Sequence, residues 1–200
     1  MEIDDVVFEV RESLRQEKIA ERGRIPPELR HELSIEIVRK LKEHIHRKNF
    51  KFIHCYISFR SEVETRDLIE DEIKSGIRVV VPVVEQLDGK SLLIHTEISG
   101  LDNLKKGTFG LDEPVERRLS SLESLDAVIL PLAAFDRRGT RLGYGKGFYD
   151  KFLHELPKSV ERIGLAFSIQ ELENIPQLPH DESLDTIITE REVIKIFHNV

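Results

Sequence analysis

The run Arg141-Leu-Gly-Tyr-Gly-Lys-Gly147 has the residue types of a phosphate-binding loop. Glycines stand at 143, 145 and 147, directly before a segment that could begin a helix at Phe148. Glycine tolerates positive φ and close approach of a ligand, so alternating glycines can turn several backbone N–H groups toward one anion. Arg141 and Lys146 would add positive charge, and a helix N-terminus would add its dipole. The alternative is a sharp structural turn, because the spacing matches neither the dinucleotide-binding fingerprint nor the Walker A motif.

A carboxylate follows this run. Asp150 comes directly after the aromatic pair Phe148-Tyr149. Next to a bound phosphate, its negative charge would be repelled unless a hard cation such as Mg²⁺ lay between the two groups. If no phosphate binds, Asp150 would serve as a helix cap or form a surface salt bridge.

Other reactive residue types are poorly arranged for chemistry. His44 and His46 are two residues apart and would not share one face of a helix, which argues against a zinc pair. The sequence contains no HExxH motif, no second cysteine and no GxSxG nucleophile elbow. Cys55 lies in an apolar run, which predicts a buried, unreactive thiol and fits a reducing cytoplasm.

The segments that must position the glycine run alternate between strand and helix patterns. Apolar runs of strand length occupy 50–57, 77–84, 126–132 and 162–167, with shorter ones near 92–94, 185–189 and 193–197. Helical periodicity or helix start and stop signals occupy 4–22, 27–45, 63–76 and a segment from 148 onward, with Asp4 and Asp5 as expected N-caps of the first helix. The order strand, helix, strand over 50–84 predicts a parallel strand pair, and 100–114 is expected to cross the surface. The class is therefore α/β.

Composition limits the kind of protein. The 200 residues are 40% hydrophobic and 34% charged, which suits one folded domain over residues 1–200 and excludes global disorder. The formal charge of −7 argues against a broad nucleic-acid surface, although a local basic pocket is compatible with it. No apolar run approaches the about 20 residues that cross a bilayer, and the N-terminus does not resemble a signal peptide. We therefore expect a cytoplasmic protein with no membrane partner.

The run Leu130-Pro-Leu-Ala-Ala-Phe-Asp-Arg-Arg-Gly-Thr-Arg-Leu-Gly-Tyr-Gly-Lys-Gly-Phe-Tyr-Asp150 resembles the signature of the 5-formyltetrahydrofolate cyclo-ligases, also called methenyltetrahydrofolate synthetases. Further matches follow in family order and span nearly the whole chain: Ser61-Glu-Val-Glu-Thr65, Gly107-Thr-Phe-Gly-Leu-Asp-Glu-Pro114, Gln170, His180-Asp181 and Asp185. The resemblance implies a three-layer α/β/α sandwich with a mainly parallel central sheet. It also implies ATP- and Mg²⁺-dependent conversion of 5-formyltetrahydrofolate to 5,10-methenyltetrahydrofolate, with release of ADP and phosphate. Phosphorylation of the formyl oxygen would create the leaving group that attack by N10 displaces.

The resemblance also implies roles for individual residues. ATP would be held by Arg11, Arg15, Arg141, Leu142, Gly143, Tyr144, Gly145, Lys146, Gly147, Phe148 and Tyr149, and Mg²⁺ by Asp150 and Asp181. Among these residues, Arg141, Lys146 and Tyr149 would be catalytic. The reduced folate would contact Phe59, Glu64 and Tyr149, with Phe59 stacking on the pterin and Glu64 accepting its hydrogen bonds.

Simpler roles compete with several of these assignments. Phe59 could be a packed aromatic residue, Glu64 a charge in the first turn of a helix, and Asp181 an exposed turn residue. Arg11 stands where lysine is typical of the family, and a solvated helix charge is its alternative. For the whole protein, the alternatives are a non-catalytic regulator that binds ATP or a reduced pterin, and a related enzyme acting on another formylated pterin. The sequence leaves the oligomeric state open.

Overall fold

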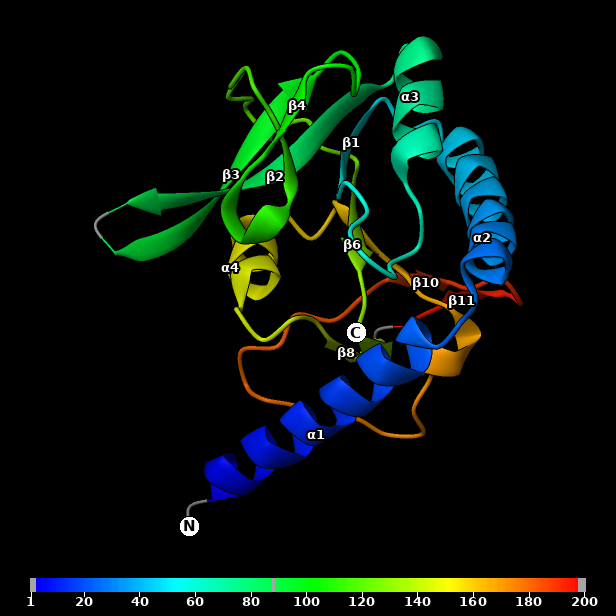
Figure 1. The fold of residues 1–200 in the computed structure, drawn as a ribbon, viewed down its shortest axis with the longest axis vertical. Helices are drawn as coiled ribbons and strands as arrows, with labels where there is room; N and C mark the ends of the chain where they lie inside the picture. The colour runs from blue at the N-terminus through cyan, green and yellow to red at the C-terminus, as the bar shows by residue number, and fades with distance from the viewer. Residues whose placement is uncertain (1–2, 88, 198–200) are drawn as a thin grey trace.

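A computed structural model describes residues 3–87 and 89–197, and within these ranges seven strands form a central sheet (Figure 1). Its strands lie in the order β11-β10-β9-β6-β1-β2-β3. Their bounds are β1 Phe52–Cys55, β2 Arg78–Leu87, β3 Lys90–Ile98, β6 Ala127–Pro131, β9 Glu161–Leu165, β10 Thr186–Ile188 and β11 Val193–Lys195. The helices are α1 Ile3–Gly23, α2 Pro27–Lys48, α3 Arg66–Lys74 and α4 Phe148–Glu155. Two small hairpins, β4 Leu104–Lys106 with β5 Asp112–Pro114 and β7 Ala134–Phe135 with β8 Arg141–Leu142, lie outside this sheet.

The interior of the sheet is parallel. Strand β1 pairs in parallel with β2 and β6, β6 with β9, and β9 with β10, whereas the edge strands β3 and β11 are antiparallel to their neighbours. The parallel pair expected over 50–84 is thereby confirmed, with Ile53 opposite Val79. Strands buried on both faces read as continuous apolar runs, which is why the sequence showed them without alternation.

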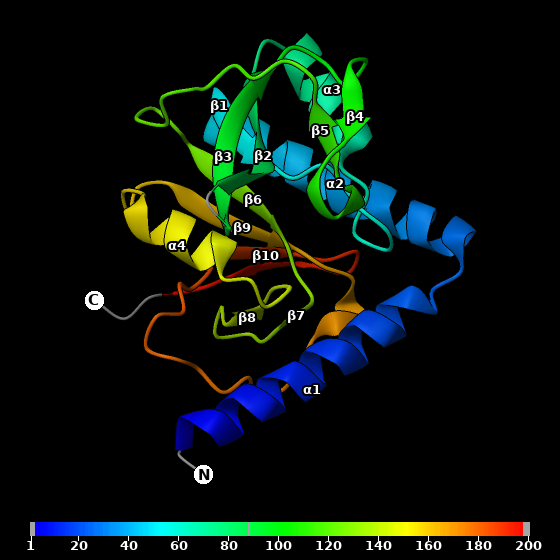
Figure 2. The same cartoon turned by 60° about the vertical axis from the view of Figure 1, so that its left-hand side comes forward.

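Helices cover both faces of the sheet, as Figure 2 shows. Ile37 and Leu41 of α2 and Leu68 of α3 join one buried core, whereas Phe152 and Leu153 of α4 join the core on the opposite face. Helix α1 packs through Leu14 and Ile19 against a third, smaller core formed by Ala133, Ala134, Leu142 and Ile175. The expected three-layer α/β/α arrangement is therefore confirmed.

A topological switch point lies between β1 and β6. After β1 the chain runs through 56–65 to α3 on one face, and after β6 it runs through 132–147 to α4 on the other face. In open α/β sheets the crevice at the carboxyl ends of two such diverging strands is where ligands bind. The fold thus directs the glycine-rich run into that crevice.

Several boundaries differ from the sequence expectations. Helix α1 already includes Ile3, so Asp4 and Asp5 lie inside its first turn instead of capping it. The segment 100–114, expected to cross the surface, contains the β4–β5 hairpin, whose connection holds Phe109 at a φ of 61°. The two-residue strands β7 and β8 escaped detection because strands this short carry no periodicity. No helix among the described residues is long and apolar enough to cross a membrane.

The buried His54 of β1 supports a prediction about pH. It is fully buried among the rings of His95, Tyr149 and Phe152, and neither of its ring nitrogens has a hydrogen-bond partner in the described part of the chain. Burial holds the pKa of His54 well below its ordinary 6.5, and it lowers the pKa of His95 to about 4. As the pH falls below 6.5, the unfolded chain therefore takes up protons that the folded chain does not, and stability is lost.

We expect the free energy of unfolding to be smaller at pH 5 than at pH 7, and His54→Leu to reduce this difference. Urea unfolding at the two pH values measures it. The exposed His31, whose pKa is raised mainly by its hydrogen bond to Glu64, provides the control, because His31→Gln should not reduce the difference. Equal pH dependence in the parent protein and His54→Leu would contradict this account.

Candidate active site

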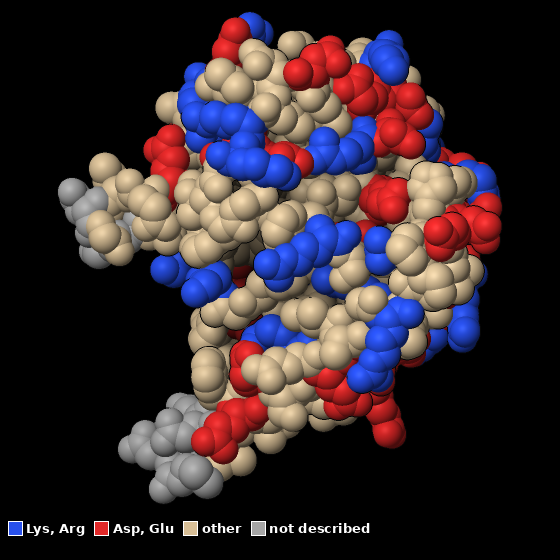
Figure 3. Space-filling view, viewed as in Figure 1, with Lys and Arg blue, Asp and Glu red and all other residues tan. Residues whose placement is uncertain are grey.

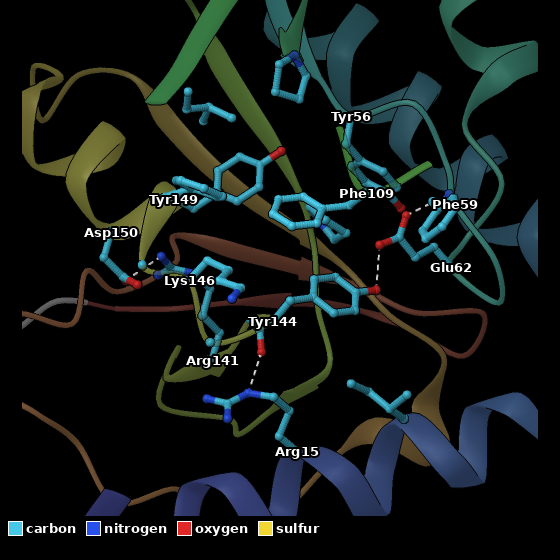
Figure 4. Close-up of a pocket in the computed structure, with 18 of the residues that line it drawn as sticks. Arg15, Tyr56, Phe59, Glu62, Phe109, Arg141, Tyr144, Lys146, Tyr149 and Asp150 are labelled. Carbon is cyan, nitrogen blue, oxygen red and sulfur yellow. Dashed lines mark hydrogen bonds and ion pairs between the residues drawn. The ribbon is translucent and has the colours of Figure 1, made fainter. Parts of the chain in front are cut away.

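A cavity of about 600 Å³ opens at the carboxyl ends of β1 and β6. Its walls come from α1, the turn after β1, the glycine-rich loop before α4 and the β4–β5 hairpin (Figure 4). On this face, lysine and arginine side chains lie around a hollow above α1 (Figure 3). The lining cations are Arg11, Arg15, Arg22, Arg60, Arg141 and Lys146, and the lining carboxylates are Glu62, Asp112, Asp150 and Asp181. The excess of positive charge suits a polyanionic ligand even though the whole chain is acidic.

The glycine-rich loop is held from below by α1. Gly145 and Gly147 have φ angles of 79° and 66°, which favour glycine, and Gly147 directly precedes the first residue of α4. Arg15 donates from Nε to the carbonyl oxygen of Gly143 at 2.7 Å. An anchored loop that leads into a helix N-terminus is a geometry that can bind an anion.

Two cations of the loop region differ in environment. Arg141 is 6% exposed and donates to Asp150 Oδ1 at 2.6 Å and to the carbonyl oxygen of Glu182. Burial lowers the pKa of Arg141, and the nearby carboxylates Asp150 and Asp181 oppose that shift. Lys146 is exposed, its Nζ lies 5.9 Å from the ring centroid of Phe109, and no carboxylate lies within ion-pair distance of it in the described residues.

The two expected metal ligands both line the cavity, and each is paired with an arginine. Asp150 carries the Arg141 contact on Oδ1 alone. Asp181 receives Arg11 on both oxygens, at 2.6 and 2.9 Å, and Oδ2 also accepts the N–H of Leu178. Arg11 is 8% exposed and is therefore not a solvated helix charge. Of the two carboxylates, Asp150 is the one with an oxygen that no side chain or N–H group of the described residues occupies, so this oxygen could take a cation.

No group of three or more His, Cys, Asp or Glu residues that could hold a metal occurs in residues 3–87 and 89–197. Mg²⁺ commonly takes only one or two carboxylates and completes its shell with water and substrate phosphates. Asp150, with Asp181 on the same cavity, therefore fits an ion that arrives with a phosphate ligand.

A buried carboxylate lies on the side of the cavity opposite Asp150 (Figure 4). Glu62 is 6% exposed, its Oε2 accepts the backbone N–H of Phe59 at 2.8 Å, and its Oε1 accepts the hydroxyl of Tyr144. Burial raises the pKa of Glu62, while the hydroxyl of Tyr144, the Phe59 N–H and the charge of Arg22 act against that shift. The half-buried ring of Phe59 lies on the same turn, so an aromatic face and a carboxylate meet at one place.

Tyr149 presents an unused donor. Its hydroxyl oxygen is buried and has no hydrogen-bond partner among the residues that the structure describes. Burial raises its pKa far above the ordinary value of 10, so the hydroxyl keeps its proton near neutral pH. A buried hydroxyl without a partner costs about 1–3 kcal/mol, which a ligand atom in the cavity would recover.

Most of the sequence-predicted site residues meet in this cavity, but two do not. Glu64 does not line it; its side chain is 42% exposed and lies 2.7 Å from Nδ1 of His31. Leu142 is fully buried in the core beside α1, so its side chain cannot contact a ligand. The positions therefore do not support a pterin contact by the Glu64 side chain, whereas a backbone contact of Leu142 with the phosphates stays a prediction.

Glu62 is the residue that sequence reasoning missed. The chain makes a tight turn in which the N–H of Glu62 bonds to the carbonyl oxygen of Phe59 at 3.2 Å, and this turn directs Glu62 inward. Glu64 lies beyond the turn, beside α2. The segment Phe59-Arg-Ser-Glu62 lacks the Gly, Pro, Asn and Asp residues that mark most turns, so the sequence offered no clear signal for it.

Comparisons with known proteins all identify the same enzyme family. Residues 7–190 match the model of the 5-formyltetrahydrofolate cyclo-ligase family. The chain is 30% identical over 181 residues to the 5-formyltetrahydrofolate cyclo-ligase of Haemophilus influenzae, covering 89% of this chain and 96% of that protein. It is 33% identical over 147 residues to that of Escherichia coli K12, covering 70% and 79% respectively. The solved 5,10-methenyltetrahydrofolate synthetase of Aquifex aeolicus superposes with a TM-score of 0.82 at 28% identity, covering 96% of this chain and 95% of that structure.

Proposed function

Because this chain belongs to the 5-formyltetrahydrofolate cyclo-ligase family, we propose that its cavity binds 5-formyltetrahydrofolate and ATP side by side. The chain is a cyclo-ligase that closes the ring of 5,10-methenyltetrahydrofolate. Its residues divide that task between two ends of the cavity. One observation supports this division. The same cavity is lined on one side by the Glu62 carboxylate next to Phe59, and on the other side by the glycine-rich loop with its cations.

The loop side suits the triphosphate. Arg141 and Lys146 neutralise phosphate charge, and Arg15 fixes the loop whose backbone faces the anion. Arg11 of α1 adds a further cation, and it would exchange its partner Asp181 for the phosphates. Positioning and charge neutralisation are the main contributions a protein makes to phosphoryl transfer, so these groups supply most of what the step requires.

The Glu62 side suits the pterin. A reduced pterin offers a 2-amino group and a ring N–H as neighbouring donors, and a carboxylate accepts such a pair well. Phe59, with Phe109 from the β4–β5 hairpin, supplies aromatic surface for the ring system. Glu62 therefore takes the role that the sequence assigned to Glu64.

The reaction follows from placing both substrates in one cavity. The formyl oxygen attacks the γ-phosphorus and the bond to the ADP oxygen breaks. N10 then adds to the formyl carbon, the carbon–oxygen bond breaks to release phosphate, and N10 gives up its proton. Holding N10 next to the activated carbon makes ring closure an intramolecular step of high effective concentration. The protonated hydroxyl of Tyr149 would donate a hydrogen bond to an oxygen of the reacting group.

Asp150 and, after release from Arg11, Asp181 would hold Mg²⁺ against the phosphates. The ion would supply neutralisation of charge on the transferring phosphoryl group. Asp150 accepts the Arg141 guanidinium on Oδ1, so it can orient that group and offer Oδ2 to the ion.

Absorbance-monitored cyclisation with purified protein, ATP, Mg²⁺ and 5-formyltetrahydrofolate tests this function. We expect methenyl product and ADP in equal amounts. ADP without methenyl product would indicate another formylated acceptor, and failure to bind ATP would overturn the two-substrate cavity.

Replacing the candidate metal ligand gives a separate prediction. Asp150→Asn should lower turnover and raise the Mg²⁺ concentration for half-maximal activity about tenfold or more, because an amide is a weaker ligand for a hard cation. Asparagine has nearly the same size as aspartate, and Asp150 lies inside α4, whose N-cap is Gly147, so the fold should persist. Activity against Mg²⁺ at saturating ATP measures the shift.

Asp67→Asn is the matched control, since Asp67 is the exposed acid in the first turn of α3 and does not line the cavity. It should leave the Mg²⁺ curve unchanged. The same curve for folded Asp150→Asn as for the parent protein would remove Asp150 from the metal site.

A further inference from the structure

One buried arginine joins three segments around the cavity. Arg22 of α1 is 2% exposed. Its Nε donates to Ser61 Oγ at 3.1 Å, its Nη1 to the carbonyl oxygen of Leu132 at 3.0 Å, and its Nη2 to Tyr144 Oη at 3.0 Å. These partners lie on the turn after β1, at the end of β6 and in the glycine-rich loop. A planar fork with all its arms engaged fixes the relative positions of what it holds.

Tyr144 continues this chain of contacts to the opposite side of the cavity. The hydroxyl oxygen of Tyr144 accepts a hydrogen bond from Arg22, and the same hydroxyl donates to Glu62 Oε1. The bond from Arg22 therefore orients the hydroxyl group that donates to Glu62. The ring lies in the loop between Gly143 and Gly145 and is 45% exposed, over the cavity (Figure 4). Movement of the loop therefore moves the hydrogen bond that orients Glu62.

We propose that Arg22 and Tyr144 couple nucleotide binding to folate recognition, by tying the glycine-rich loop to the Glu62 carboxylate. This inference rests on the proposed function, in which the loop holds phosphates and Glu62 holds the pterin. Phosphate bound at the loop fixes Tyr144, and Tyr144 then fixes the carboxylate in the orientation that accepts the pterin donors. Both residues are positioning residues, because they act on the substrates through the loop and through Glu62.

Such coupling is reciprocal by thermodynamic necessity. If nucleotide tightens folate binding by some factor, folate tightens nucleotide binding by the same factor. Energetic coupling between sites commonly lies at about 5- to 150-fold, so we expect about fivefold or more here. The ratio of two dissociation constants measures it and is independent of how tightly either ligand binds alone.

The experiment titrates 5-formyltetrahydrofolate into the full chain with Mg²⁺, with and without a saturating non-hydrolysable ATP analogue. The parent protein should bind the folate about fivefold or more tightly when the analogue is present. In Tyr144→Phe the ratio should fall close to one, while the analogue alone still binds. Because the ring of Tyr144 is partly exposed, the phenylalanine variant should fold.

Arg22→Lys tests the other end of the chain of contacts and should also lower the ratio, because a single ammonium cannot bridge three segments. Arg24→Lys, two residues further on and exposed, is the matched control and should keep the parent ratio. A purely structural role for Tyr144 would lower both single-ligand affinities or the melting temperature and leave the ratio at the parent value.

A parent ratio of one, or an unchanged ratio in Tyr144→Phe, overturns the coupling even when the enzyme forms methenyl product normally. Loss of analogue binding in the parent protein, in contrast, overturns the proposed function itself. The two failures are therefore distinguishable in one set of titrations.

Discussion

Glu62→Gln should lower the affinity for 5-formyltetrahydrofolate about ten- to hundredfold and leave ATP affinity nearly unchanged. The amide keeps the shape of the side chain but replaces a charged acceptor, and hydrogen bonds to charged groups contribute about 1.5–3 kcal/mol, where 1.4 kcal/mol is tenfold. Equilibrium titration of each substrate separates the two effects. The melting temperature at pH 7 should change little, because the glutamine oxygen can still accept the Phe59 N–H and its amide nitrogen can donate to the hydroxyl oxygen of Tyr144.

The control variant changes Glu64, which lies two positions after Glu62 in the same motif. Glu64→Gln makes the identical chemical change on a side chain that is half-exposed and outside the cavity. It should leave folate affinity within about twofold of the parent, because the Glu64 side chain does not line the cavity. Loss of its exposed pairing with His31 should cost at most about 1 kcal/mol of stability. A larger loss from Glu64→Gln than from Glu62→Gln would return the pterin contact to the residue first expected from the sequence.

The charge of Glu62 also predicts a pH dependence. Its pKa lies above the ordinary value, so lowering the pH from neutrality protonates it earlier than an exposed glutamate. Folate affinity should therefore decline at mildly acidic pH in the parent protein and be less dependent on pH in Glu62→Gln. Equal slopes in both proteins would assign the titration to another group.

Arg141→Ala should reduce turnover about hundredfold or more and weaken ATP binding. Removing one pre-positioned group that stabilises transition-state charge commonly costs a factor of about 10²–10³. The loss also leaves Asp150 without its cation, which adds repulsion of the phosphates. Arg141→Lys should recover part of the activity, since it restores charge without the planar fork.

Arg137→Ala is the matched control for Arg141→Ala. Arg137 is 55% exposed and pairs with Glu171 and Glu192 at 2.6 and 2.5 Å, and it does not line the cavity. Its replacement should leave turnover and ATP affinity unchanged. Nucleotide titration and steady-state cyclisation at saturating ATP compare the three variants, and parent-like values in Arg141→Ala would remove it from the phosphate site.

The positions of the main elements followed from the sequence because they depend on local patterns. Apolar runs bounded by turn residues located the buried strands, and period-3.6 stripes located α1 and α2. Alternating glycines before Phe148 marked the loop and the start of α4, which is where the helix begins. The parallel pair at β1 and β2 followed from the order of elements, since a crossover helix between two strands favours parallel pairing.

Very short strands, and contacts between residues far apart in the chain, could not be predicted from the sequence. Strands β7 and β8 have two residues each and no period to detect. The β4–β5 hairpin brings Phe109 and Asp112 to the cavity from a segment that the sequence predicted to cross the surface. Each of these depends on contacts with residues far away in the chain.

The sequence by itself determined the α/β class, the glycine loop and the types of residue available for phosphate chemistry, because neighbouring residues encode them. Only the tertiary structure decided which carboxylates share the cavity. Two glutamates of the same motif, Glu62 and Glu64, look equivalent in one dimension, yet a turn closed on Phe59 buries the first and leaves the second beside His31. Likewise, the sequence did not show that Arg11 and Asp181 pair with each other. In the fold, Arg11 Nη1 lies 2.6 Å from Asp181 Oδ2 although 170 positions separate the two residues, because charge pairing depends on distance in space and not along the chain.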